Sequence, residues 1–226
     1  MTTVYLDKQI EEALRDADPQ TMLERAELVA TLAHEGQTRS GGEPYITHPA
    51  AVVDILRNEF GIRDENILVT AWLHDVVEDC DGIFSEHIEK WFGVHVRRWI
   101  HQLSNDNIPK DCQPLKKATV KAALQHYKAA VMDEQAVWVK AADRLHNMRS
   151  LENAKWHSDA KLGYARDGVL LVNALTYRFF ALTGSMNFPL QLVVHRQAKS
   201  LGVDIDEIMN PIRVPVDYEG KKNDST

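Results

Sequence analysis

Four ionisable side chains fall within six positions of an apolar stretch, AWLHDVVED. They are His74, Asp75, Glu78 and Asp79. Burying a charged side chain costs free energy unless a partner compensates the charge, so this grouping needs an explanation. Divalent metal ions bind neutral imidazole and deprotonated carboxylate groups. A bound metal ion is therefore one explanation for the grouping.

The spacing within this stretch suits that chemistry if the stretch is helical. Adjacent residues on a helix point about 100° apart, so His74 and Asp75 could both reach an ion lying between their directions. Glu78 and Asp79 would lie one turn further along, about 5–6 Å away at Cβ. The spacing predicts two ligands followed by two carboxylates that could handle a bound water.

Two other segments could complete the ligand set. His48 lies in PYITHP, where a rigid turn before Pro49 would present it at the start of a helix. Asp143 follows the apolar run AVWV and is expected to face inward, with Asn147 one turn later on the same face. Two histidines and two aspartates without cysteine suit manganese, iron(II) or another first-row metal.

Simpler explanations stay open for each of these residues. His48 could be a turn residue whose ring forms a local hydrogen bond, and Asp143 could be the salt-bridge partner of Arg144 or Arg149. An HD dipeptide arises often by chance. Four ionisable groups on one apolar helix have fewer alternatives, and this favours a functional site.

The elements that must position these residues are almost all helical. Apolar residues at helical spacing predict helices over 6–17, 21–36, 49–61, 64–79, 84–93, 94–104, 116–131, 134–154, 158–184, 189–202 and 204–210. Asp64 is the expected N-cap of the helix that carries His74. The stretch VHVRRWI has a strand-like composition, but its flanks favour a helix. No alternating strand pattern or internal repeat is present, so the sequence predicts an all-α fold.

Length and charge limit the classes of function. The chain has 226 residues and a net charge of −7, and it has no basic run. This argues against partners such as duplex nucleic acid or an anionic membrane surface. Two cysteines make no disulfide framework. We see no signal peptide and no membrane-spanning run, and we expect a cytoplasmic protein. We expect one domain over 1–215 and a disordered tail over 216–226.

Three ordered motifs resemble those of a known family. HDVVED, with RSGGEPYITHP before it and VKAADRLHNMRSL after it, resembles the HD-domain phosphohydrolases. Within them it resembles the hydrolase domain of RelA/SpoT homologues and the small alarmone hydrolases. The resemblance covers residues 20–180 and implies an HD-domain helical bundle. It implies removal of pyrophosphate from the 3′ position of guanosine tetra- or pentaphosphate, usually with one Mn²⁺. The length beyond the motifs leaves no room for a synthetase domain, so hydrolysis alone is expected.

The resemblance also implies roles for individual residues, carried over by motif. The implied metal ligands are His48, His74, Asp75 and Asp143, and the implied catalytic acidic pair is Glu78 and Asp79. The implied substrate contacts are Arg39 against the guanine base, Asn147 and Ser150 at the nucleoside, and Tyr164 and Lys161 near the phosphates.

One loop departs from the family pattern. In LSNDNIPK the residues Ser104 and Asn107 stand where related hydrolases carry threonine and lysine, and Lys110 could replace that lysine. This departure keeps a second prediction open: a phosphohydrolase acting on an adenine alarmone, a dNTP or NADPH. A third is a metal- and nucleotide-binding regulator without turnover, against which the intact acidic pair and ligand set argue.

Overall fold

The computed structural model describes residues 5–104, 123–185 and 187–209. These residues form helices and no β-sheet, which confirms the predicted all-α fold; Thr38 and Pro44 form an isolated antiparallel bridge in the loop after α2. The predicted tail, most of the divergent loop and the start of the helix predicted over 116–131 lie outside the described ranges. Among the described residues, no helix is both long enough and apolar enough to cross a bilayer.

The described helices differ widely in length, from 4 residues in α5 to 26 in α10. In chain order they are α1 (Leu6–Ala17), α2 (Met22–Ala33), α3 (Thr47–Asp54), a π-helical turn (Ile55–Glu59), α4 (Glu65–Leu73), α5 (Val76–Asp79), α6 (Ser85–Phe92), α7 (Val94–Leu103), a helix over 123–129, α9 (Glu134–Arg149), a 3₁₀ turn (Ser150–Glu152), α10 (Ser158–Thr183), α11 (Pro189–Ser200) and α12 (Ile205–Met209).

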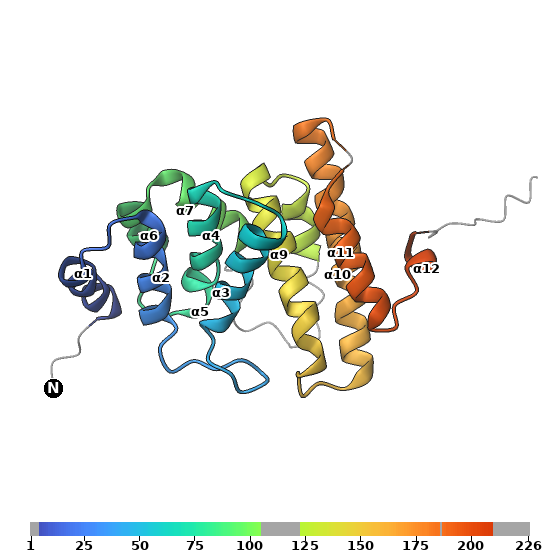
Figure 1. The fold of residues 1–226 in the computed structure, drawn as a ribbon, viewed down its shortest axis with the longest axis horizontal. Helices are drawn as coiled ribbons and strands as arrows, with labels where there is room; N and C mark the ends of the chain where they lie inside the picture. The colour runs from blue at the N-terminus through green and yellow to red at the C-terminus, as the bar shows by residue number, and fades with distance from the viewer. Residues whose placement is uncertain (1–4, 105–122, 186, 210–226) are drawn as a thin grey trace, which may run out of the picture.

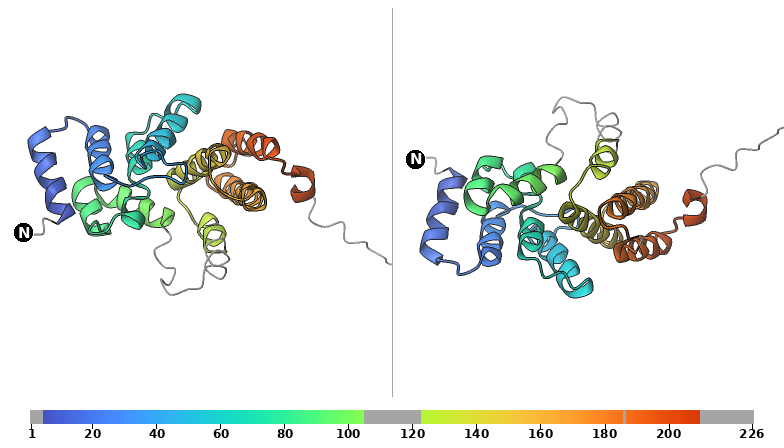
Figure 2. Two further views of the ribbon diagram at one scale, coloured as in Figure 1. Left: turned by 90° about the horizontal axis from the view of Figure 1, so that it is seen from below. Right: turned by 90° about the horizontal axis from the view of Figure 1, so that it is seen from above.

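The centre of the bundle is α9. It packs against α3, α4 and α7 on one side and against α10 and α11 on the other. Figures 1 and 2 show it between the group α1–α7 and the group α10–α12. Val139, Ala141, Ala142 and Leu145 of α9 are fully buried, as expected of a helix that is apolar around most of its surface. Any polar side chain on α9 that points into this packing must find a partner.

Several local predictions are confirmed. Oδ1 of Asp64 accepts hydrogen bonds from the backbone N–H groups of Asn66 and Ile67, so Asp64 caps α4. The stretch VHVRRWI is helical and forms most of α7. The long helix α10 ends at Gly184, whose φ of 72° is the left-handed conformation that glycine adopts without a steric penalty.

The predicted continuous helix over 64–79 is wrong in one respect. α4 ends at Leu73 and α5 begins at Val76, so His74 and Asp75 lie in a turn between two helices. Nδ1 of His74 lies 2.8 Å from the carbonyl oxygen of Ala71, which the N–H of Asp75 would use in an unbroken helix. The imidazole therefore competes with the helical hydrogen bonds at the break.

The cap at Asp64 predicts a change in stability. Replacing Asp64 with alanine should lower the free energy of unfolding by about 1 kcal/mol, because two N–H groups at the start of α4 lose their acceptor. Replacing Asp64 with asparagine should cost much less, since the amide oxygen can still accept. Urea denaturation followed by circular dichroism measures both. The control is Asp16→Ala, at an exposed residue near the end of α1, and equal losses for the two Asp64 variants would contradict the capping role.

Candidate active site

Three side chains converge at the start of α3 and at the break between α4 and α5. Nε2 of His48 lies 3.2 Å from Nε2 of His74. Oδ2 of Asp75 lies 3.4 Å from Nε2 of His48 and 3.3 Å from Nε2 of His74. Both histidines are buried. Ligand atoms bound about 2.1 Å from a single ion lie about 3.0–3.4 Å apart, so this spacing matches that of a metal site.

The hydrogen bonds behind the rings fix which nitrogen faces the cluster. A carbonyl oxygen only accepts, so Nδ1–H of His74 donates to Ala71 and leaves a lone pair on Nε2. Nε2 of His48 likewise keeps a lone pair when Nδ1–H of His48 donates to Nδ1 of His146, 2.7 Å away. Burial lowers the pKa of His48 and so favours its neutral form. Two lone pairs facing each other beside a carboxylate repel, and a divalent cation removes that repulsion.

Asp143 reaches the same cluster from α9. Its Oδ1 lies 3.3 Å from Nε2 of His48 and 3.8 Å from Nε2 of His74. Asp143 is buried, as its position after an apolar run predicted. Its ion-pair partner is Lys140, with Nζ at 3.1 Å, and not the arginines considered from the sequence. Burial opposes ionisation, but the charge of Lys140 outweighs it and holds the pKa of Asp143 well below its usual range.

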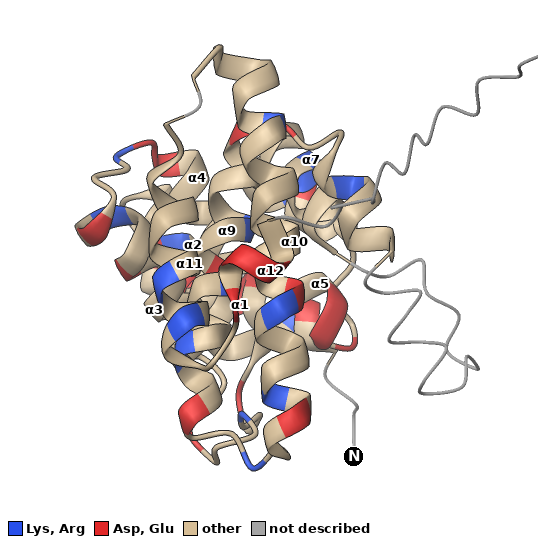
Figure 3. Ribbon diagram, turned by 90° about the vertical axis from the view of Figure 1, so that its right-hand side faces the viewer, with Lys and Arg blue, Asp and Glu red and all other residues tan. Residues whose placement is uncertain are grey.

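The two acidic residues of α5 lie beside this cluster, and Figure 3 shows the acidic character of that helix. The hydroxyl of Tyr45 lies 2.7 Å from Oδ2 of Asp75 and 2.8 Å from Oδ2 of Asp79. Burial and the charge of Asp75 raise the pKa of Asp79. Burial likewise raises the pKa of Tyr45, so it remains a donor. Asp79 is thereby suited to take up and release a proton.

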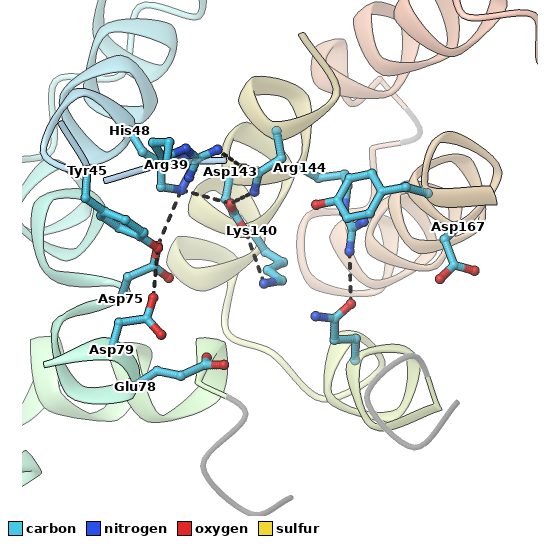
Figure 4. A pocket seen from close by; sticks show the side chains of 13 residues that line it. Arg39, Tyr45, His48, Asp75, Glu78, Asp79, Lys140, Asp143, Arg144 and Asp167 are labelled. Carbon is cyan, nitrogen blue, oxygen red and sulfur yellow. Dashed lines mark hydrogen bonds and ion pairs between the residues drawn. The ribbon is translucent and has the colours of Figure 1, made fainter. Parts of the chain in front are cut away.

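Two adjoining cavities open over these groups. The larger, about 340 Å³, is lined by the carboxylates of Asp75, Glu78 and Asp79 on one side and by residues of α9 and α10 on the other. Figure 4 shows how these side chains face the cavity. The smaller, about 260 Å³, is more apolar and includes Leu151 and Trp156. The space thus divides into a charged part, where carboxylates and cations face one another, and a less polar part with aliphatic and aromatic walls.

Most of the predicted substrate residues lie at these cavities. Arg39, Asn147 and Tyr164 line both of them, and Ser150 lines the smaller. Lys161 is the exception: it lines neither cavity, and its Nζ lies 3.4 Å from the carbonyl oxygen of Glu152. The structure therefore brings together all the predicted site residues except Lys161.

A chain of hydrogen bonds connects the smaller cavity to the cluster. Nη2 of Arg39 donates to Oδ1 of Asn147 at 2.6 Å, and Nδ2 of Asn147 donates to Oδ1 of Asp143 at 2.5 Å. Because Asn147 lies one helical turn after Asp143, the two side chains share a face of α9.

Sequence reasoning missed several residues at the site. His146 and Tyr45 hold His48 and the two aspartates in place, and Trp156 packs edge-on against Tyr164 with ring centroids 5.6 Å apart. The signal for His146 was its helical spacing of three from Asp143. Tyr45 lies three residues before His48 and gave no comparable signal.

Comparison with family models gives a clear match. A model described as an HD domain matches residues 26–170, which is more than half of the chain.

Curated relatives share extensive sequence with this chain. The bifunctional (p)ppGpp synthase/hydrolase SpoT of Escherichia coli is 35% identical over 178 residues, covering 77% of this chain and 24% of SpoT. A probable guanosine-3′,5′-bis(diphosphate) 3′-pyrophosphohydrolase of Synechocystis is 36% identical over 142 residues, covering 59% of this chain and 17% of that protein. This chain therefore spans about a quarter or less of the length of these relatives.

Solved structures give a similar result. One, described as a metazoan ortholog of SpoT that hydrolyses ppGpp and plays a role in starvation responses, matches with a TM-score of 0.66 and 28% identity, covering 81% of this chain and 97% of that one. A protein of Listeria monocytogenes matches with a TM-score of 0.51 and 22% identity, covering 71% of this chain and 98% of its own, which supports the fold alone.

The contact between His146 and His48 predicts an effect on metal affinity. Replacing His146 with phenylalanine should weaken Mn²⁺ binding about 10- to 100-fold, because Nδ1 of His48 loses the partner that fixes its orientation. Calorimetric titration with Mn²⁺ measures the change. His146→Gln, whose side chain retains an acceptor, should recover part of the affinity.

The matched control is His157→Phe, which changes an exposed histidine before α10 and should leave the affinity unaltered. An unchanged affinity in His146→Phe would show that this contact does not support the ligand.

Proposed function

Because this chain belongs to the HD-domain family, we propose that it is a metal-dependent hydrolase that releases pyrophosphate from the 3′ position of guanosine tetra- or pentaphosphate. The observation that carries the proposal is the cluster of His48, His74 and Asp75, whose ligand atoms lie 3.2–3.4 Å apart at a cavity lined by further carboxylates. The names of the relatives support the choice of substrate.

We assign the metal ligands as His48, His74, Asp75 and Asp143, and the metal as Mn²⁺. Two imidazoles and two carboxylates without thiolate suit a first-row divalent ion. When bound, such an ion neutralises phosphate charge and lowers the pKa of a water molecule. Asp143 is ionised beside Lys140, so it offers a carboxylate to the ion without first losing a proton.

We assign the proton transfers to Glu78 and Asp79. The attacking water forms a bond to the phosphorus next to the 3′ oxygen, and the bond between that phosphorus and the 3′ oxygen breaks. One carboxylate orients the water and takes its proton, and a carboxylic acid supplies a proton to the departing 3′ oxygen. The raised pKa of Asp79 supports a part in this exchange, and Tyr45 holds that carboxyl beside Asp75.

We place the nucleoside in the smaller cavity. A planar guanidinium stacks on an aromatic base, and Arg39 lies where the two cavities meet. Ser150 and Asn147 offer polar groups to the ribose and base. A phosphate contact from Lys161 stays a prediction, and its position outside both cavities gives it no support.

Other expectations stay predictions of this proposal. They are a cytoplasmic location, hydrolysis without synthesis, and a small nucleotide as the substrate with neither nucleic acid nor membrane as a partner. The alternative nucleotides rested on the loop over 104–110, of which residues 105–110 lie outside the described ranges.

The direct test is product analysis by anion exchange. Purified protein with Mn²⁺ should convert guanosine tetraphosphate to GDP and pyrophosphate, and chelation of the metal should abolish the conversion. A panel of an adenine alarmone, a dNTP and NADPH should be turned over more slowly. A clear preference for one of these would keep the site and overturn the substrate, and nucleotide binding without any turnover would favour the regulator.

The division between ligands and proton-transfer groups predicts two kinds of variant. Asp75→Ala and Asp143→Ala should lose bound Mn²⁺ and activity together, because each removes a ligand. Glu78→Ala should retain bound Mn²⁺ while kcat falls about 100- to 10,000-fold, the usual contribution of a proton-transfer group. Metal content is measured by elemental analysis and kcat by pyrophosphate release.

The control for these variants is Glu86→Ala, at an exposed acidic residue of α6, which should alter neither quantity. Equal loss of metal in the Glu78 and Asp75 variants would show that the division of roles is wrong.

A further inference from the structure

Arg144 is a buried cation that the proposed reaction has not used. It lines the larger cavity from α9, and its residue surface is 5% exposed. Among the described residues, no carboxylate oxygen lies within 4.0 Å of its nitrogens, although Asp167 lines the same cavity. A buried guanidinium is costly unless an anion compensates it. The described part of the protein holds this charge in place without neutralising it.

The contacts of Arg144 are neutral, and they fix its orientation. Nη2 donates to Oε1 of Gln125 at 2.9 Å, and Cζ lies 4.4 Å from the centre of the Tyr164 ring. Nε is buried and has no hydrogen-bond partner among the described residues. The buried Nε is not open to the cavity, but the guanidinium is held rigidly at the cavity wall, and a planar guanidinium can donate to a phosphate oxygen from its other nitrogens.

The opposite helix makes room for this side chain. Gly168 lies inside α10, where glycine costs about 1 kcal/mol relative to alanine. A Cβ added at Gly168 would lie 3.3 Å from Cδ of Arg144 and 2.7 Å from Sδ of Met148. The absence of a side chain at Gly168 thus lets the stem of Arg144 lie against the backbone of α10.

Arg144 lies apart from the metal-ligand cluster. Gln125 and the backbone of α10 at Gly168 hold its side chain, whereas the carboxylate of Asp143 faces His48. In Figure 4, Arg144 and Asp167 lie across the cavity from Asp75 and Asp79. Lys140 lies nearer the cluster, with its ammonium group paired to Asp143. The cavity therefore has two separate cationic regions.

We propose that Arg144 binds a second phosphate-bearing arm of the substrate, distinct from the arm that is hydrolysed. This inference rests on the proposed function for the identity of that arm, which is the 5′-diphosphate of the guanosine nucleotide. Arg144 then determines specificity: it makes the enzyme favour nucleotides phosphorylated at both the 3′ and the 5′ positions over those phosphorylated at the 3′ position alone.

The test compares two substrates that share the reacting group. They are guanosine tetraphosphate and guanosine 3′-diphosphate with a free 5′-hydroxyl. The wild-type enzyme should show a higher kcat/KM for the first. Arg144→Gln should reduce this preference about 10- to 100-fold, the usual effect of losing a hydrogen bond to a charged group. The kcat/KM for guanosine 3′-diphosphate should stay unchanged.

Two further variants make the comparison decisive. Arg149→Gln removes an arginine whose Nη1 and Nη2 pair with Glu59, 2.6 and 2.9 Å away, and should leave the preference intact. Arg144→Lys keeps the charge without the planar fork and should reduce the preference by a smaller factor. It replaces Arg144→Gln if that variant does not fold, as judged by thermal unfolding.

The outcomes separate this inference from the proposed function. An equal loss on both substrates, or no loss on either, would overturn the role of Arg144 while leaving the hydrolase assignment in place. If the wild-type enzyme hydrolyses neither nucleotide, the hydrolase assignment is wrong. Equilibrium binding of the same two nucleotides then tests Arg144, because an unaltered affinity ratio in Arg144→Gln would contradict its role.

Discussion

The site depends on keeping the ionised carboxylate of Asp143 inside a packed helical core. The cost of burying that charge is offset by Lys140 one turn earlier on α9 and by Asn147 one turn later. The charge is buried because α9 is enclosed on both sides by other helices. The apolar packing of α9 therefore does more than stabilise the fold: it creates the low-polarity surroundings in which a few charges act strongly on one another.

The distribution of charge across the larger cavity follows from the same helix. Three carboxylates enter from α5 and the break before it, and α9 contributes Lys140 and Arg144 together with Asp143. A highly charged anionic ligand can then be held from one side while groups on the other side act on it. The net charge of −7 does not by itself exclude such a ligand, because Lys140, Arg144 and Arg39 bring three cations to a cavity that five carboxylates also line.

The sequence was sufficient to predict most of the helices and the convergence of His74 with Asp75, because helical periodicity and local spacing carry that information. It could not reveal the break between α4 and α5, which depends on where the imidazole of His74 finds an acceptor. Nor could it reveal the pairing of His48 with His146, which are 98 residues apart and meet only when α3 packs on α9. Lys161 shows that closeness in sequence can also mislead. It is three residues from Tyr164, which lines both cavities, yet Lys161 lines neither.

The hydrogen-bonded chain from Arg39 through Asn147 to Asp143 has a thermodynamic consequence. In the proposed function, a base that stacks on Arg39 would contact a guanidinium that also holds Asn147, and Asn147 in turn holds a carboxylate of the cluster. If ion binding and base binding are coupled through this chain, linkage makes the coupling reciprocal: the ion would change the affinity for the base by the same factor as the base changes the affinity for the ion.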